Sequence, residues 1–241
     1  MKVKIISKSN NLLDAMYVGA RNCYHSGTPL DIDVDNIPED KKIALVTKVL
    51  DMGHTSISEH GVVTFAIEGV SRALLAQLTR HRAGISFSVQ SQRYVEIKED
   101  IDKIEYLSRY GLPEEVLPVA EKYFVLDWVD ESKASKFWVA SQMLDALYNY
   151  LFLTQNGVLA EDARMFLPNA MKTNVVMSVN LRALTNFCNE RMCVKAQKEI
   201  RQLANCLKEN LVLQYEWYGK YLTPKCVRYG TCKEKDGCKN V

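Results

Sequence analysis

The sequence predicts one domain that mixes helices and strands, followed by a short tail. Residues 61–70 are rich in β-branched and apolar residues between two glycines, a pattern typical of a strand. Residues 39–54 carry apolar residues at helical spacing instead. The 241 residues are 47% apolar and 25% charged, which is ordinary globular composition, and no linker, repeat or low-complexity segment divides them. We therefore expect a single domain over residues 1–220 and a cysteine-containing tail of unknown role over residues 221–241.

Local patterns predict the order of the elements. Pro38 suits the start of a helix, Ser71 can cap one, and Gly84 and Gly157 can end one. Residues 95–131 are charged, contain two prolines and are predicted to be irregular. The expected elements are strands at residues 1–7, 61–70 and 171–179, helices at 10–27, 39–54, 73–82, 132–157 and 161–168, an extended segment at 86–94, and helices from residue 181 to about residue 218.

The stretch from residue 54 to residue 94 has an unusual choice of charged residues. It holds three of the four histidines, four arginines and six serines but no lysine, and its excess of two positive charges equals the net charge of the chain. Arginine pairs two-pronged with phosphate or carboxylate, whereas lysine is a flexible point charge. On the expected helix Gln77, Arg80 and His81 stand at i, i+3 and i+4. The pattern favours an anion-binding site over a solvated helix end, in which arginines would only complement the helix dipole.

A second informative stretch follows the strand that ends before Asn180. On the expected helix Arg182, Asn186 and Asn189 share one face, whereas Arg191 falls amid the apolar face if the helix continues. A buried cation needs a partner, because an unpaired buried charge is very costly. We expect a ligand or another subunit as the partner of Arg191. The alternative is that the helix ends near Asn189 and Arg191 points to solvent.

Cysteine usage and charge exclude several classes of protein. Seven cysteines, an odd number spread through the chain, argue against a disulfide framework. Cys226, Cys232 and Cys238 in the tail are six residues apart, without the close pairs of a zinc site, so no metal is expected. No basic stripe points to nucleic acid. No apolar run is long enough for a signal peptide or a membrane span, so a cytoplasmic protein is expected.

The two stretches together resemble the flavin-dependent thymidylate synthase family. The resemblance rests on HTSISEH, GVSRALLAQL, RHR and SFSVQSQRY in the first stretch, and on N-x-R-x-x-x-N-F followed by an arginine in the second. The family places seven residues between RHR and the serine, whereas eight separate Arg82 from Ser91 here. The extra residue lies between Arg82 and Ser86, where Gly84 can absorb a bulge.

The resemblance implies a fold, a reaction and a set of residues. The fold would be of the α/β (α+β) class, an antiparallel sheet flanked by long helices, assembled as a homotetramer with sites shared between subunits. The reaction would methylate dUMP to dTMP, with the carbon from 5,10-methylenetetrahydrofolate and reducing equivalents from NADPH through FAD. The residues implied for FAD are Ser56, Arg80, His81, Arg82, Val89, Asn180, Arg182 and Asn186. Those implied for dUMP are Gln77, Leu78, Thr79, Arg80, Val89, Gln90, Ser91, Gln92, Arg93, Arg164 and Arg191.

The expected chemistry needs no enzyme nucleophile. In the family, reduced flavin delivers hydride to uracil C6, so Ser91 is interpreted as a substrate contact and Arg191 as the catalytic group that activates the pyrimidine. Two alternatives remain open. One is a non-catalytic nucleotide- or RNA-binding module. The other is a cysteine-dependent thymidylate synthase with Cys188 or Cys193 as nucleophile, although a thiol on the apolar face, such as Cys188, is more typically inert.

Overall fold

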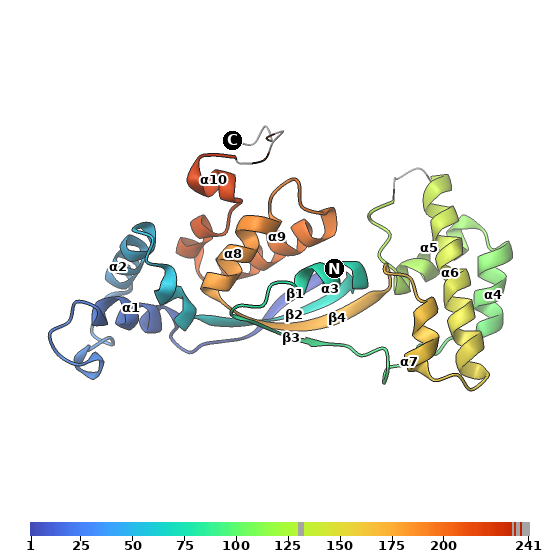
Figure 1. Cartoon of the computed structure of the whole chain (residues 1–241), viewed down its shortest axis with the longest axis horizontal. Coiled ribbons are helices and arrows are strands. Elements are labelled where there is room, and N and C mark those ends of the chain that lie inside the picture. The colour runs from blue at the N-terminus through green and yellow to red at the C-terminus, as the bar shows by residue number, and fades with distance from the viewer. Residues whose placement is uncertain (130–132, 233, 235–236, 238–241) are drawn as a thin grey trace. The chain divides into compact units, whose positions relative to one another are not determined.

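The computed structural model describes residues 1–129, 133–232, 234 and 237 (Figure 1). The chain divides into two compact units. Unit 1 comprises Met1, Glu68–Leu78 and Val89–Val175, and unit 2 comprises Lys2–Ile67, Thr79–Ser88 and the residues from Val176 onward.

The elements are, in order, β1 (Lys2–Lys8), α1 (Leu12–Asn22), η1 (Pro29–Asp31), α2 (Glu39–Asp51), η2 (Thr55–His60), β2 (Val62–Ser71), α3 (Arg72–Leu78), β3 (Ile85–Val89), α4 (Ile101–Tyr110), α5 (Pro113–Tyr123), α6 (Lys133–Gln155), α7 (Ala160–Ala163), η3 (Arg164–Phe166), β4 (Lys172–Asn180), α8 (Leu181–Arg191), α9 (Lys198–Val212), η4 (Glu216–Tyr221) and α10 (Lys225–Tyr229), where η marks a 3-10 segment.

The four strands form one antiparallel sheet in the order β1-β2-β4-β3, which confirms the predicted fold class. Strand β2 continues past Gly69 to Ser71, one residue farther than the sequence pattern indicated. Gly69 adopts a φ of 70°, and its N–H donates to the Asn174 side chain at 3.1 Å. Glycine adopts a positive φ without the steric penalty of other residues, so the strand can bend here without ending.

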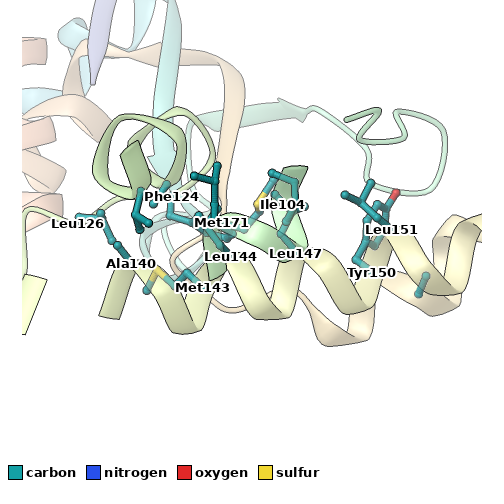
Figure 2. Packing of buried hydrophobic residues seen from close by; sticks show 14 residues of the cluster. Ile104, Phe124, Leu126, Ala140, Met143, Leu144, Leu147, Tyr150, Leu151 and Met171 are labelled. Atoms are coloured by element: carbon teal, nitrogen blue, oxygen red, sulfur yellow. The ribbon is translucent and has the colours of Figure 1, made fainter. Parts of the chain in front are cut away.

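The core of unit 1 lies between α6 and the two helices α4 and α5 that pack against it (Figure 2). The prediction that residues 95–131 are irregular is therefore wrong. Ile104 and Leu107 in α4, and Val116 and Ala120 in α5, are buried against α6. Burying one large apolar side chain stabilises by roughly 1.5–3 kcal/mol. Several such side chains together outweigh the roughly 3 kcal/mol penalty of the proline inside α5.

In unit 2, helix α8, which follows strand β4, is held in place by a buried tyrosine. The hydroxyl of Tyr218, in η4, donates to the Leu181 carbonyl at 3.2 Å and lies 3.0 Å from the Thr185 hydroxyl. Tyr218 is 1% exposed, so η4 is fixed against the first turn of α8. The helix predicted to begin after Pro38 is present as α2, which confirms that prediction.

The tail contains a short helix of its own. Helix α10 contacts α8 and buries Cys226. The division into a domain of residues 1–220 and a tail of residues 221–241 stays a prediction. Within the described part of the chain, no helix is both long and apolar enough to cross a membrane.

Candidate active site

The arginine-rich motif lies in a loop rather than on a helix. Ser71 caps α3 as predicted, its hydroxyl accepting from the Leu74 N–H at 2.9 Å. The helix ends at Leu78, however, so the expectation that it continues to residue 82 is wrong and Gln77, Arg80 and His81 do not share a helix face. Tertiary contacts override the local pattern, because Leu78 is fully buried and His81 contacts α8.

A hydrogen bond joins this loop to the end of α8. The Nε of Arg191 donates to the Nε2 of His81 at 2.9 Å, and the His81 ring meets Phe187 edge-on at 5.0 Å. Burial and then the charge of Arg191 lower the pKa of His81. Nε2 must be unprotonated to accept, so both observations indicate a neutral imidazole. The structure thus gives Arg191 a hydrogen-bond partner in the same chain, His81, while the expectation that a ligand or another subunit also contacts Arg191 stays a prediction.

The start of α8 is fixed to the same loop. The Asn180 side chain caps the helix by accepting from the Ala183 N–H at 2.8 Å, and the Asn180 N–H donates to the Gly84 carbonyl at 3.0 Å. Gly84 has a φ of 73°, and a Cβ there would collide with the Asn180 amide. The segment between Arg82 and Ser86, which is one residue longer here than in the family, thus contains a glycine that the local geometry requires.

A cavity of about 710 Å³ in unit 2 contains two of the predicted flavin residues, Arg182 and Asn186. Its other walls come from the end of α2, from η2, from η4 and from α10. The lining residues are Leu50, Asp51, Gly53, Thr55, Ser58, Arg182, Thr185, Asn186, Tyr218, Lys220, Tyr221, Thr223, Val227, Arg228 and Tyr229. Arg182 forms an ion pair with Glu59, and both side chains are about half exposed. Ser56, also predicted for FAD, lies exposed in η2 between lining residues.

A second, smaller cavity of about 130 Å³ in unit 1 contains predicted substrate residues. Gln90, Ser91 and Gln92 line it together with Arg72, which sequence reasoning missed. An Arg72 Nη donates to the Gln90 carbonyl at 2.8 Å, whereas its buried Nε finds no partner among the described residues. Burial, and then the charge of Arg164, lower the pKa of Arg72. A half-buried guanidinium with a free donor is suited to an anion. The sequence offered one signal for Arg72, namely its position in the lysine-free stretch of residues 54–94, directly after the capping serine.

The two predicted nucleotide arginines of unit 1, Arg93 and Arg164, both bond to one glutamate. The Nε of Arg93 lies 2.7 Å from a Glu161 carboxylate oxygen, and the Nε of Arg164 donates to the Glu161 carbonyl at 2.9 Å. The Ser91 hydroxyl accepts from the Arg93 N–H at 3.1 Å, which orders the turn after β3. The contact of a substrate with Leu78 stays a prediction that only its backbone can fulfil, because the side chain is fully buried.

The predicted residues therefore fall in both units. Those in unit 1 are Gln77, Leu78, Val89, Gln90, Ser91, Gln92, Arg93 and Arg164. Those in unit 2 are Ser56, Thr79, Arg80, His81, Arg82, Asn180, Arg182, Asn186 and Arg191. Thr79, Arg80 and Arg82 are exposed, and the guanidinium groups of Arg80 and Arg82 are available to a ligand.

The structure argues against Cys188 as a catalytic nucleophile. Cys188 is fully buried, and burial raises the pKa of its thiol to about 12, so the reactive thiolate is absent near neutral pH. Cys193, Cys226 and Cys232 line a separate cavity of about 640 Å³. No group of three or more histidine, cysteine, aspartate or glutamate side chains among the described residues could hold a metal ion, and Cys238 lies outside those residues.

Comparison with known proteins identifies the family. The family model for "thymidylate synthase complementing protein" matches residues 4–214. The flavin-dependent thymidylate synthase of Nitratidesulfovibrio vulgaris is 35% identical, with 97% of this chain and 91% of that protein covered, and that of Pyrococcus horikoshii is 33% identical, with 98% and 91% covered. The crystal structure of the Helicobacter pylori enzyme complexed with FAD and dUMP superposes with a TM-score of 0.73 at 27% identity, over 92% of this chain and 100% of that one. This chain belongs to the flavin-dependent thymidylate synthase family.

Proposed function

We propose that this protein methylates dUMP to dTMP, using FAD, NADPH and 5,10-methylenetetrahydrofolate. The observation that carries the proposal is the hydrogen bond between His81 of the arginine-rich loop and Arg191 at the end of α8. It joins the two sequence motifs on which the family resemblance rests. The non-catalytic binding module and the cysteine-dependent enzyme find no support, the latter because the Cys188 thiol is buried.

The donors around the larger cavity fit the phosphate and ribose groups of FAD. Arg182 supplies a two-pronged cation, Asn186 an amide, and Thr55 and Ser58 hydroxyls. FAD, when bound, would supply the hydride that uracil C6 accepts. The exposed Arg80 and Arg82 add further donors from the loop, and we propose that they contact the same cofactor.

Arg191 is proposed to activate the pyrimidine. Because its Nε is engaged by His81, both Nη groups remain to contact the uracil edge. A cation about 4 Å from an ionised ring contributes roughly 4 kcal/mol at an effective dielectric constant near 20. That energy corresponds to about three pKa units, enough to favour ionisation of the ring and a more nucleophilic C5. His81 would hold the guanidinium at the angle that this contact needs.

The substrate phosphate is proposed to bind in unit 1. Arg93 and Arg164 are held beside one another by Glu161, and Arg72 has an unused buried donor. Three guanidinium groups suit a phosphate dianion, which accepts several charge-assisted hydrogen bonds. Ser91, with its hydroxyl already in the turn, would add a neutral donor.

Assembly and location complete the proposal. We propose a cytoplasmic homotetramer in which subunits share the sites, and light scattering on purified protein tests the oligomeric state. The test of function is a visible spectrum of the protein with and without added FAD, followed by dUMP-dependent dTMP formation. Colourless protein that takes up no flavin after reconstitution would rule out the enzyme and favour a nucleotide-binding module.

A further inference from the structure

The C-terminal tail supplies one wall of the cavity that contains Arg182 and Asn186. Tyr221 of η4 and Arg228 and Tyr229 of α10 lie on this wall. None of these residues belongs to the motifs that carry the family resemblance. The cavity, at about 710 Å³, falls within the range of about 300–1,000 Å³ typical of small-ligand sites.

Arg228 differs from the other cations of the cavity. Arg182 pairs with Glu59, and Lys220 pairs with Asp51 at 2.8 Å. For Arg228, by contrast, no carboxylate among the described residues lies within ion-pair distance, although its charge contributes to the lowered pKa of Asp51. Its charge therefore stays available to an anion.

Aromatic rings hold the Arg228 side chain in place. Its guanidinium carbon lies 5.6 Å from the centroid of the Tyr221 ring and 5.4 Å from that of Tyr229, both within cation–π range. Tyr221 is itself fixed, since its hydroxyl donates to Asp51 at 2.8 Å. An arginine whose orientation is set before binding loses less conformational entropy when an anion arrives.

The remaining polar atoms of the cavity are those a nucleotide uses. The Thr223 hydroxyl is buried without a partner among the described residues, and Thr55 and Asn186 line the same cavity. Leaving a buried hydroxyl without a hydrogen-bond partner costs free energy, and a ligand that bonds to the hydroxyl removes this cost. Hydroxyl and amide groups suit ribose and phosphate oxygens, and arginine suits the phosphate charge.

We propose that Arg228 of the tail is a further phosphate-binding residue of this cavity, contacting the adenosine diphosphate group of a bound dinucleotide. The inference rests on the proposed function, because FAD and NADPH are the two dinucleotides of that reaction and both carry this group. Arg228 of the tail would thereby bind the ligand together with residues of the two motifs.

The test is Arg228→Gln, with Lys225→Gln as the matched control. Lys225 lies in the same helix and loses the same charge, but it lines the 640 Å³ cavity and pairs with Glu190 at 3.5 Å. FAD affinity is measured by flavin fluorescence and NADP⁺ affinity by calorimetry on FAD-loaded protein. We expect Arg228→Gln to weaken one of them about ten- to a hundredfold, the effect of losing a charge-assisted hydrogen bond, while Lys225→Gln stays within about twofold.

A weakened FAD affinity agrees with the cofactor site proposed above, whereas a weakened NADP⁺ affinity alone would reassign the cavity to NADPH. The proposal is overturned if both affinities stay within about twofold of wild type, or if only methylenetetrahydrofolate binding weakens. Arg228→Lys, which keeps the charge but not the planar fork, is expected to weaken binding partially and covers the case in which Arg228→Gln does not fold. Wild-type protein that binds neither FAD nor dUMP would refute the proposed function. Wild-type protein that binds both, with an unchanged Arg228→Gln, would refute this inference alone.

Discussion

The hydrogen bond between Arg191 and His81 predicts how substrate affinity depends on pH. The bond requires an unprotonated Nε2, and protonation would replace it with repulsion between two cations. Hydrogen bonds to charged groups contribute about 1.5–3 kcal/mol. Because both side chains are only partly buried, we take the lower end, which corresponds to about tenfold in the population of correctly oriented Arg191.

The direction follows from the lowered pKa of His81. Above pH 6.5, its ordinary value, the imidazole is neutral in both the folded and the unfolded chain. Below pH 6.5, His81 takes up a proton in the unfolded chain before it does so in the folded chain. The free energy of unfolding therefore falls as the pH drops toward the pKa of His81 in the folded state. dUMP affinity should fall in the acidic limb, where the folded protein itself becomes protonated.

The assay is calorimetric titration of dUMP into wild type, His81→Gln and His81→Leu between about pH 5 and pH 8. The phosphate of dUMP also titrates, near pH 6, but equally in all three proteins. We expect wild type to lose about tenfold more affinity in acid than His81→Gln, whose amide accepts a hydrogen bond without titrating. His81→Leu should be about tenfold weaker throughout. An acidic limb of the same size in His81→Gln, or wild-type affinity in His81→Leu at pH 8, would refute the role assigned to this bond.

Three further predictions concern other parts of the chain. Arg191→Ala should lower single-turnover dTMP formation about a hundredfold or more at saturating dUMP, with Arg191→Lys intermediate, and near-normal turnover would show that Arg191 only binds. Cys188→Ala should keep dTMP formation within about tenfold, allowing for packing losses at a buried site, and a loss of several orders of magnitude in folded protein would contradict the inert thiol. Gly84→Ala should lower the thermal midpoint more than Gly157→Ala, because both have a positive φ but only at Gly84 would a Cβ collide with a neighbour; equal shifts would contradict this.

Local chemistry explains which elements could be predicted. Ser71 as a cap and Pro38 before a helix act through the backbone of their own neighbours, and both predictions are confirmed. Helices α4 and α5 were missed because the charges and prolines of residues 95–131 were given more weight than two local signals: Asp100 caps α4, and Pro113 begins α5. Packing against α6 then shows what the apolar residues of both helices do.

The same distinction applies to the candidate site. The motif residues could be found from type and spacing, but the partner of Arg191 could not, because His81 lies 110 positions away. Arg72 was missed for a similar reason, since its suitability for binding an anion depends on the buried, unpartnered Nε, which no sequence pattern shows. The wall of the larger cavity formed by the tail likewise exists only in three dimensions.

The ion pair between Glu59 and Arg182 makes ligand binding an exchange. An anion that contacts Arg182 competes with a carboxylate that already engages one of its Nη groups, and an exposed pair of this kind stabilises by only about 0–1 kcal/mol. A singly charged competitor therefore replaces one negative charge with another and gains little. A pyrophosphate carries more charge than the carboxylate it displaces and keeps a net advantage. Glu59 thus acts as an internal counter-ion that discriminates among anions by their charge.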